Sequence, residues 1–404
     1  MTSDLLAALA AGPGWPPALP PQGPLGGVRV LDLSRVLAGP YCCLVLADLG
    51  ADVLKVERPG LGDDTRRWGP PFHGEDAAYF FSVNRDRRSI ALDLRTPAGQ
   101  AVVGRLAQAA DVVVENFLPR HLAALGLEAL RDTTDAVWVS VRGAGGDGPD
   151  GGKPGYDVMA QARSGLMSVT GTTEPTKVGV AVTDVVTGLY AAVGALAGLL
   201  ARPRRDRDPL RVEVGLLEAA VSMLVNQASN ALVGGVVPGY AGNAHPNIVP
   251  YGPLPCADTA LVLGAGNDAQ FAQLCRALDL VPEPGWSTNA GRVADRARVL
   301  AALTAVLSGR TARQWAEVLD AAGVPCAPVQ DLAQLQDDPQ VVATGQLQEV
   351  DHPAGSVRVV GSPFRLDGER PRVRRAPPLL GQHTTEVLTG LGLSAAQVEE
   401  VTGG

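Results

Sequence analysis

The feature that most constrains the fold is a strand–helix–strand pattern near the start of the chain. Val28 to Leu33 (VRVLDL) is an apolar run of strand length, and a loop and a helix ending at Leu49–Gly50 follow it. A second apolar strand runs through Val53 to Val56. A helical crossover of this kind joins parallel neighbours in one sheet. The pattern therefore predicts an α/β fold, with a parallel sheet covered by helices on both faces.

Further strands and helices of the same kind follow along the chain. We expect strands at Ser89–Leu92, Val112–Val114, Val137–Val141 and Val178–Val182, and helices at Pro97–Ala109 and Val185–Leu200. The last of these is an uncharged run that could also be a membrane span. It is shorter than the roughly 20 residues that a bilayer needs, and it contains three glycines. We therefore predict a buried core helix.

Composition excludes several classes of function. The net charge of -8 over 404 residues argues against general nucleic-acid binding. The turn Ser34–Pro40 lacks the G-x-G-x-x-G fingerprint, so no NAD or FAD site is predicted. The five cysteines are scattered without a C-x-x-C pair, which argues against a zinc site and indicates a reduced, cytoplasmic setting.

A run of arginines and a single aspartate lie at positions that suit ligand binding. Arg85, Arg87 and Arg88 precede a strand, and guanidinium groups suit phosphate recognition, although such a run is more often a solvated turn. Asp184 lies between a predicted strand and a predicted helix, at the sheet edge where ligands bind. It is the candidate nucleophile. From position alone, helix capping by Thr183 or Asp184 is the more common role.

Several longer stretches resemble one enzyme family. They include GVRVLDLSRVLAGPYCCLVLADLGADVLKVERPGLGDDTR, NRDRRSIALDL, ADVVVENFLP, PGYDVMAQARSG, VGVAVTDVVTG, GNAHPNIVPYG and PPLLGQHTTEVL, and they run in order from Gly27 nearly to the end. In these motifs the chain resembles the family III CoA-transferases of the CaiB/BaiF type, a group that also contains formyl-CoA transferases and α-methylacyl-CoA racemases.

The resemblance implies an architecture. It implies a Rossmann-like large domain built from residues 27–205 and 340–404, and a smaller inserted α+β domain at 225–330. Residues 206–224 and 331–339 are then linkers, and 1–26 form a flexible extension whose Leu/Ala-rich start could be a short helix. It also implies a homodimer of two interlocked chains.

The resemblance further implies a site. Asp184 is its nucleophile. The implied coenzyme A contacts are Leu37, Ala38, Arg58, Leu92, Asp93, Leu94, Arg95, Asn116, Phe117, Leu118, Pro154, Gly155, Tyr156 and Asp157. Two departures stand out: Ala124 occupies the place of a family arginine, so that Arg120, Arg87 or Arg88 would have to substitute, and the family's glycine-rich flap is absent or shortened after PLPCAD.

The implied reaction is the transfer of CoA from an acyl-CoA to a carboxylic acid through an aspartyl anhydride and an aspartyl-CoA thioester, with no permanently bound cofactor or metal. The racemases of the family use a histidine where this chain has Tyr156. Tyrosine, with an ordinary pKa of about 10, is a poor base near neutral pH, so we favour the transferase over a racemase. A non-catalytic CoA-binding protein is the third alternative, and the presence of Asp184 weighs against it.

Overall fold

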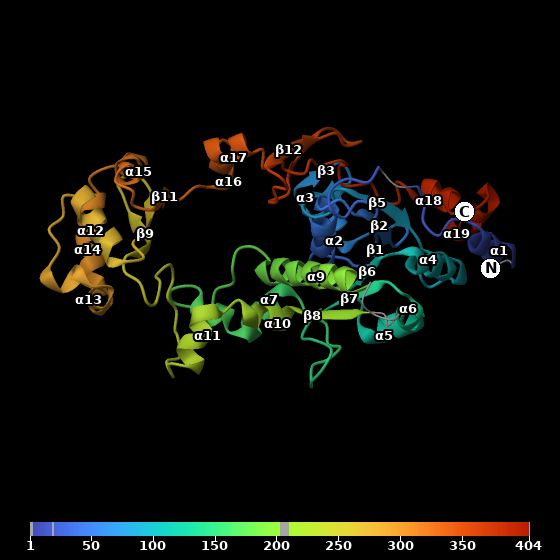
Figure 1. Ribbon diagram of the computed structural model, residues 1–404, viewed down its shortest axis with the longest axis horizontal. Helices are drawn as coiled ribbons and strands as arrows, with labels where there is room; N and C mark the ends of the chain where they lie inside the picture. Colours follow the sequence, from blue (N-terminus) through green and yellow to red (C-terminus); the bar gives the residue numbers. More distant parts are fainter. Residues whose placement is uncertain (1–2, 18–19, 203–209, 404) are drawn as a thin grey trace. The chain divides into compact units, whose positions relative to one another are not determined.

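The chain forms two units (Figure 1). The computed structural model describes residues 3–17, 20–202 and 210–403. The larger unit comprises Met1–Leu166, Val178–Val225 and Val342–Gly404, and the smaller comprises Met167–Lys177 and Asn226–Val341. The large unit is thus built from both ends of the chain, with the small unit inserted.

A six-stranded sheet forms the centre of the large unit, and all its strand pairs are parallel. Its order is β5 (Arg87–Ala91), β2 (Asp52–Glu57), β1 (Arg29–Asp32), β6 (Val112–Glu115), β7 (Val137–Arg142) and β8 (Arg211–Gly215). The direction of winding reverses between β1 and β6. Ligands of open α/β sheets bind at such a switch point, beyond the carboxyl ends of the strands. The predicted α/β fold with a parallel sheet is confirmed.

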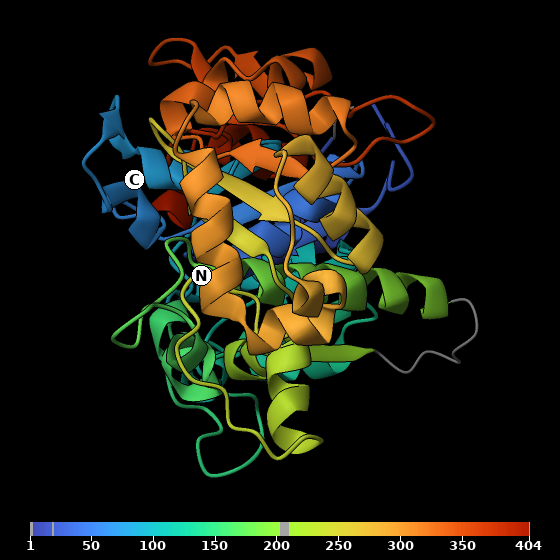
Figure 2. The same cartoon turned by 90° about the vertical axis from the view of Figure 1, so that its left-hand side faces the viewer.

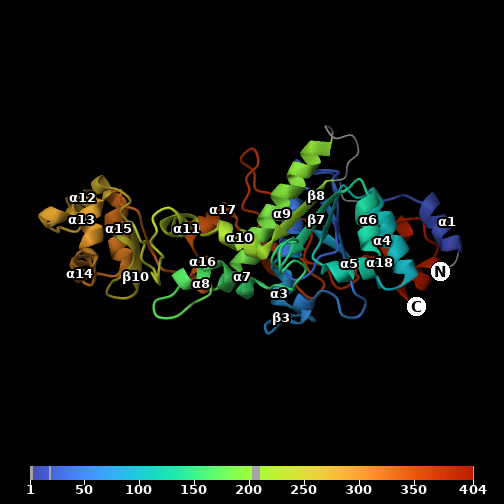
Figure 3. The same cartoon turned by 90° about the horizontal axis from the view of Figure 1, so that it is seen from below.

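Side chains that alternate along the strands supply two separate cores. Leu31, Leu54 and Val113 face one layer of helices, which contains α1 (Ser3–Ala11), α4 (Pro97–Ala109), α18 (Thr384–Gly390) and α19 (Ala395–Thr402). Their neighbours Val30, Val53 and Val112 face α2 (Ala38–Asp48) and α9 (Val182–Ala201). Figure 3 shows α9 beside β7 and β8, and α4 contacts α1 and α19. Both faces of the sheet are buried, as nearly continuous apolar strands require.

Shorter elements complete the large unit. They are η1 (Asp64–Arg67), β3 (Phe72–His73), β4 (Asp76–Ala77), α3 (Ala78–Phe81), α5 (Pro119–Ala124), α6 (Leu127–Thr133), α7 (Asp157–Ser164), α10 (Leu216–Ser222), β12 (Leu347–Val350) and β13 (Val357–Val360). Helices α8 (Leu166–Val169), α11 (Val225–Leu232) and α17 (Pro339–Thr344) cross the boundaries of the units.

The small unit is an antiparallel sheet of three strands with helices. The sheet order is β11 (Cys326–Pro328), β10 (Ala260–Gly264) and β9 (Tyr251–Pro255). The helices are α12 (Asp268–Ala277), η3 (Pro284–Ser287), α13 (Asn289–Ala294), α14 (Arg296–Leu307), α15 (Ala312–Ala321) and α16 (Leu332–Gln336). Its own core includes Phe271, Trp286 and Leu303. Figure 2 shows its yellow and orange helices over the yellow strands.

The N-terminal extension differs from the prediction of a flexible segment. Leu5 and Leu9 of α1 are buried in the first core, and the indole N–H of Trp15 donates to Asp52 at 2.7 Å. Helix α1 packs on α4, and the amide of Gln397 in α19 donates to the carbonyl of Asp4 at 3.1 Å. The extension is held because its two leucines cover apolar surface on α4 and α19 that water would otherwise contact.

Three other predictions differ from the structure. Residues 178–181 form no strand, and α9 begins at Val182. The expected linker 206–224 supplies β8 and α10 within its described residues 210–224, and the expected linker 331–339 contains α16. Helix α9 itself is confirmed: its 20 residues, with a mean hydropathy of 1.7, would be long and apolar enough to cross a membrane, but Ala191, Ala192 and Ala195 pack in the second core.

Candidate active site

Two cavities in the large unit share the loop that follows β1. The larger cavity, of about 470 Å³, lies beyond the carboxyl ends of β1, β2, β5 and β6. The Asp184 cavity, of about 170 Å³, lies on the other side of the loop, next to the start of α9. Arg35 and Phe117 line both. The sheet's switch point therefore supplies two neighbouring cavities that share lining residues.

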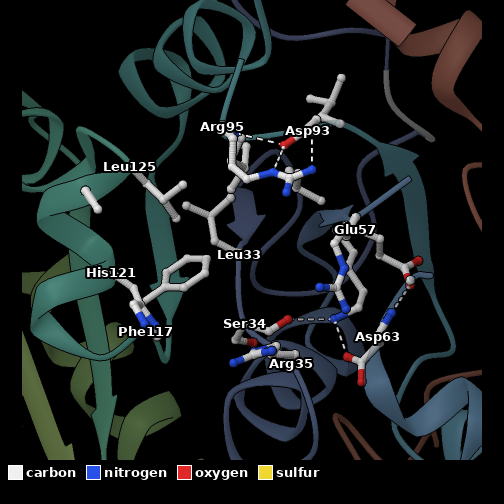
Figure 4. Close-up of a pocket in the computed structure, with 17 residues that line it drawn as sticks. Leu33, Ser34, Arg35, Glu57, Asp63, Asp93, Arg95, Phe117, His121 and Leu125 are labelled. Atoms are coloured by element: carbon white, nitrogen blue, oxygen red, sulfur yellow. Dashed lines mark hydrogen bonds and ion pairs between the residues drawn. The ribbon is translucent and has the colours of Figure 1, made fainter. Parts of the chain in front are cut away.

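The larger cavity has an apolar wall and a charged wall (Figure 4). Leu33, Phe117 and Leu125 lie on one side, and Glu57 and Asp63 lie on the other, as Figure 4 shows. Leu92 and Leu94 add further apolar surface. An apolar slot with cations at its rim suits a flat ring that carries phosphate groups.

The cations at the rim of the larger cavity differ in how they are paired. Arg95 is bound through its Nε and Nη2 atoms to Asp93, at 2.9 and 2.7 Å. Arg58 is exposed, and within the described residues no hydrogen bond or ion pair holds its guanidinium. His121 contacts Arg120 at 3.4 Å. Arg58 and His121 are therefore the cavity's available partners for an anion.

The position that lacks the family arginine lies in this cavity. Ala124 and His121 both line it, three residues apart on α5. Arg87 and Arg88, which we considered as substitutes for the arginine, line neither cavity. Their side chains are buried and pair with Asp32 and Asp52, at 2.8 and 2.7 Å. Both of those alternatives are wrong, and Arg120 stays a prediction.

The third arginine of that run is also buried. Arg85 pairs with Asp48 and Asp86, and its side chain is 3% exposed. The three arginines therefore do not form a solvated turn, and they make no phosphate contact in either of the two cavities. Guanidinium groups that enter a core need carboxylates beside them, because an unpaired buried charge is costly.

A buried ion network fixes the loop between the cavities. The Lys55 ammonium donates to the carbonyl of Ser34 at 2.7 Å and contacts the Asp63 carboxylate at 3.0 Å. Asp63 in turn accepts from the backbone N–H of Val36 at 3.2 Å. Burial opposes the charge of Lys55, but Asp32, Asp63 and Glu57 outweigh it and raise its pKa.

Val36 shows what this network holds in place. Its φ is +72°, which is rare for a β-branched residue and is strained by roughly 1–3 kcal/mol. The strained residue lies between Arg35 and Leu37, which line the cavities. Strain of this kind persists only where surrounding contacts enforce it, and here the Asp63 carboxylate does so.

The Asp184 cavity contains one buried carboxylate. Asp184 lies in the first turn of α9 and is 9% exposed. Within the described residues no hydrogen bond to its carboxylate is found. Burial, and then the charge of Asp157, raise the pKa of Asp184 to about 7. A carboxylate that is desolvated, unpaired and open to a cavity has the properties of a nucleophile.

Asp157 has the opposite surroundings and explains the start of α9. It accepts from the backbone N–H of Thr183 at 2.9 Å, from the Thr183 hydroxyl at 2.7 Å, and from the Gln161 amide at 2.7 Å. The residue before the helix is Ala181, and no side chain from within α9 caps it. The alternative that Thr183 or Asp184 is the cap is therefore wrong, since Asp157 of α7 supplies the acceptor.

The other predicted contacts divide between the two cavities. The larger cavity is lined by Arg58, Leu92, Asp93, Leu94, Arg95 and Phe117. The Asp184 cavity is lined by Leu37, Ala38, Asn116, Phe117, Leu118, Pro154, Gly155 and Tyr156. Asp157 lines neither. The structure thus brings residues from six distant stretches of sequence to one edge of the sheet.

The glycine-rich loop 143–155 lines the Asp184 cavity at its two ends, where its backbone segments lie close together. A Cβ at Gly143 would lie 2.7 Å from the backbone nitrogen of Gly155, and a Cβ at Gly155 would lie 2.6 Å from the Gly143 Cα. Both glycines line the cavity. Each position therefore needs a glycine, because the two backbone segments lie too close together for a side chain.

Tyr79 of α3 is a neighbour of Asp184 that the sequence did not reveal. Burial, and then the charge of Asp184, raise the pKa of Tyr79 to about 12. Its ring makes an edge contact with Trp68, with centroids 5.5 Å apart. Its side chain packs in the same cluster as Ala181, the residue before α9, and no hydrogen bond to Asp184 is found within the described residues. A phenol that stays protonated there is a candidate donor to an oxyanion formed at Asp184.

Two other groups of residues add no site. His245 lies in the small unit, where its Nδ1 accepts from the backbone N–H of Asn247 at 3.1 Å. Within the described residues no group of three or more His, Cys, Asp and Glu side chains could hold a metal ion.

Comparison with known proteins gives one consistent result. Residues 25–384 match the family model described as CoA-transferase family III. The chain is 40% identical to a human succinyl-CoA:glutarate CoA-transferase, over 90% of this chain and 85% of that protein. It is 37% identical to a succinyl-CoA:mesaconate CoA-transferase of Haloarcula hispanica, over 94% and 99%. A solved CAIB/BAIF family protein from Brucella suis superposes with a TM-score of 0.79 at 39% identity, over 91% of this chain and 99% of that one.

Proposed function

The chain belongs to CoA-transferase family III and moves CoA between an acyl-CoA and a carboxylic acid, and on this premise we propose that Asp184 is the residue that carries the acyl group and the coenzyme in turn. The observation that supports this proposal is the state of its carboxylate, which is buried and unpaired among the described residues and opens into a cavity. A carboxylate held by an arginine would be a weaker nucleophile, because the pairing stabilises the ground state.

The reaction then runs through two kinds of intermediate. The Asp184 carboxylate attacks the thioester carbonyl of the donor, the C–S bond breaks, and the CoA thiolate leaves an acyl-aspartyl anhydride. The thiolate attacks the aspartyl carbonyl of this anhydride and releases the donor acid, which leaves an aspartyl-CoA thioester. The acceptor carboxylate attacks that thioester, and the released thiolate takes the acyl group from the second anhydride. Asp184 is returned as a carboxylate.

The two cavities suit the two ends of coenzyme A. We place the nucleotide in the larger cavity, where Leu33, Phe117 and Leu125 present an apolar slot and Arg58 is available for phosphate. We propose that His121, which lines this cavity, takes the part of the family arginine absent at Ala124, with Arg120 in contact with it. The pantetheine arm passes the Arg35–Ala38 loop and brings the thioester to Asp184.

The substrate class follows from charge at the Asp184 cavity and from the relatives. Arg35 and Lys153 line this cavity, and both are exposed and paired only with exposed or partly exposed acids, Asp64 and Asp150. A second carboxylate on the acyl group could replace these weak surface pairs. Since two relatives are named for succinyl-CoA with a dicarboxylic acid, we propose dicarboxylates as donor and acceptor.

We also propose a homodimer of interlocked chains in a reducing compartment. Leu189, Tyr190 and Val193 of α9 are 40%, 47% and 62% exposed, and Val221 of α10 is 50% exposed beside them. An apolar face of this kind is typical of a protein–protein interface. All five cysteines are free thiols, which supports the reducing, cytoplasmic setting.

Trapping of the intermediate tests the mechanism. The protein is incubated with succinyl-CoA, quenched with hydroxylamine, digested and analysed by mass spectrometry, with CoA alone as the control. We expect a hydroxamate at Asp184 that requires the thioester. Modification at another carboxylate would contradict the assignment. Solvent deuterium entering the α-carbon of a 2-methylacyl-CoA without CoA transfer would instead indicate the racemase.

A further inference from the structure

A third cavity lies at the opposite edge of the same sheet. It has a volume of about 400 Å³ and contacts the amino ends of β1, β2 and β5, whereas the two cavities above lie at the carboxyl ends. Five arginines and two aspartates are the charged residues that line it: Arg29, Arg87, Arg88, Arg374, Arg375, Asp52 and Asp86. The substrate cavities contain none of these residues.

The positive charge in this cavity is only partly compensated. Arg29 pairs with Asp111 at 3.2 Å, Arg88 pairs with Asp52 at 2.7 Å, and Arg374 reaches Asp86 at 3.8 Å. Arg87 is held by Asp32. Arg375 is half-buried, and within the described residues no hydrogen bond or ion pair holds its guanidinium. Among the described residues, Arg375 is therefore the one arginine lining this cavity whose guanidinium has no hydrogen-bond or ion-pair partner.

A second observation points the same way. Arg88 is 1% exposed, and its Nε–H is buried without an acceptor. Leaving such a charged donor unsatisfied is costly, and each case in a native protein requires an explanation. Burial, and then the charge of Arg88, lower the pKa of Arg375. Burial, and then the charges of Arg375 and Arg88, lower the pKa of His383. Asp52 and Glu386, which contacts Arg88 at 3.7 Å, act in the opposite direction but leave the pKa of Arg375 below its ordinary value.

We propose that this cavity binds a small oxyanion, a phosphate or a carboxylate, between Arg375 and Arg88, at a site separate from the substrate site. A guanidinium presents parallel N–H donors that match two oxygens of such a group. The cavity also touches Trp15 and Pro21 of the N-terminal segment and Arg374 of the C-terminal segment. An anion there would connect the two ends of the chain to the sheet.

Thermal unfolding at constant ionic strength tests the proposal. Chloride is replaced stepwise by phosphate, and in a second series by succinate, with the protein saturated with CoA so that its substrate phosphate contacts are occupied. We expect one series to raise the Tm in a saturable way, which identifies the anion class. A Tm that stays at its value in chloride in both series would overturn the proposal. A site built for an oxyanion must prefer a group with two oxygen atoms over a spherical chloride ion.

Variants at one position separate charge from geometry. Arg375→Gln should lower the affinity for the anion at least tenfold. Arg375→Lys should lower it by an intermediate factor, because the positive charge stays but the two parallel N–H donors of the guanidinium are lost. Arg372→Gln is the matched control, since Arg372 is exposed, lies in the same segment and does not line this cavity. Unchanged affinity in Arg375→Gln would overturn the proposal.

The wild-type protein provides a test that does not depend on folding of a variant. Phenylglyoxal modifies accessible arginines, and peptide mass spectrometry reports each one. We expect the effective anion to protect Arg375 while modification of Arg372 proceeds unchanged. Equal modification of Arg375 with and without the anion would refute the site.

Discussion

Two groups of buried charged side chains in the large unit have opposite surroundings. Beneath the larger cavity, Lys55 contacts Asp63 at 3.0 Å and Arg66 contacts Glu57 at 2.7 Å. Burial opposes ionisation of Glu57, but Arg66 and Lys55 lower its pKa below the ordinary value. In the second cavity, Asp184 has no such partner among the described residues, and its pKa rises to about 7.

The difference indicates that the paired network has a structural role and that Asp184 has a chemical one. The paired network keeps its charges at every ordinary pH and holds the strained Val36 loop at a fixed place. The unpaired carboxylate changes charge near neutrality and is free to form a covalent bond. Desolvation raises the pKa of each of these carboxylates, but the cationic partners of Glu57 and Asp63 outweigh it, whereas Asp184 has only the like charge of Asp157 nearby.

The largest expected effect comes from removing the unpaired carboxylate. Asp184→Asn should lower kcat for CoA transfer by about 10³ or more, because no other nucleophile can form the anhydride. Asp147→Asn, at an exposed carboxylate that lines neither cavity, is the control and should keep near-normal turnover. The measurement is transfer from succinyl-CoA to glutarate, followed by chromatography. Turnover within tenfold of wild type in Asp184→Asn would remove the basis of the mechanism.

The next largest effect concerns the paired network, and we expect it in the free energy of unfolding. Asp63→Asn leaves the buried Lys55 ammonium without its nearest carboxylate, and breaking such a pair costs about 3–5 kcal/mol. The free energy of unfolding, from denaturant titration at pH 7, should fall by that amount. Asp64→Asn removes partly exposed surface pairs with Arg35 and Arg67, worth about 0–1 kcal/mol. Equal losses in the two variants would show that the network does not hold the loop.

The strands and long helices were predictable because their residues contain the signal locally. Val112–Glu115 and Pro97–Ala109 follow from apolar runs, a proline at the helix start and a threonine cap, and both form as predicted. Residues 178–181 failed because a short apolar run cannot be told from a loop by pattern alone. The short helix at the start of the chain forms as its Leu/Ala-rich sequence allowed, but the burial of Leu5 and Leu9 was missed because their partners on α4 and α19 are distant in sequence.

The site was predictable only where the family motifs mark it. Those motifs pointed to Asp184, Arg58 and Asn116, and the structure places all three at the two cavities. Tyr79 was missed because its relation to Asp184 arises from packing between α3 and the start of α9, not from spacing. The roles of Arg87 and Arg88 were wrong for the same reason, since their carboxylate partners lie on other strands.

A pH titration sharpens the contrast by its sign. The pKa of Asp184 is raised from 3.8 to about 7 on folding, so below pH 3.8 the carboxyl is protonated in both states. Between these values the unfolded chain ionises first, and the free energy of unfolding falls as pH rises. Above pH 7 that loss is complete, on the order of 1–4 kcal/mol.

Asp184→Asn lacks this titration, so its stability relative to wild type should be greater at pH 8 than at pH 4. Thermal unfolding at both values measures the difference. In the wild-type enzyme kcat should rise with pH through about 7, because the nucleophile must be ionised. A variant that is no more stable at pH 8 than at pH 4, relative to wild type, would show that Asp184 is ionised at low pH and therefore paired.

The smallest expected effect tests whether the unpaired carboxylate acts with a neutral donor. Tyr79→Phe removes one hydroxyl and keeps the ring contact with Trp68, so the fold and the KM for acyl-CoA should change little. If the phenol donates to the oxyanion formed at Asp184, kcat should fall about tenfold, in line with the loss of one donor in a desolvated site. The alternative is a purely structural role, in which kcat keeps its wild-type value. Trp68→Phe is the matched control, since it alters the ring pair and leaves the hydroxyl in place. A fall in kcat for Trp68→Phe but not for Tyr79→Phe would assign the effect to packing, and Asp184 would then react without a donor from Tyr79.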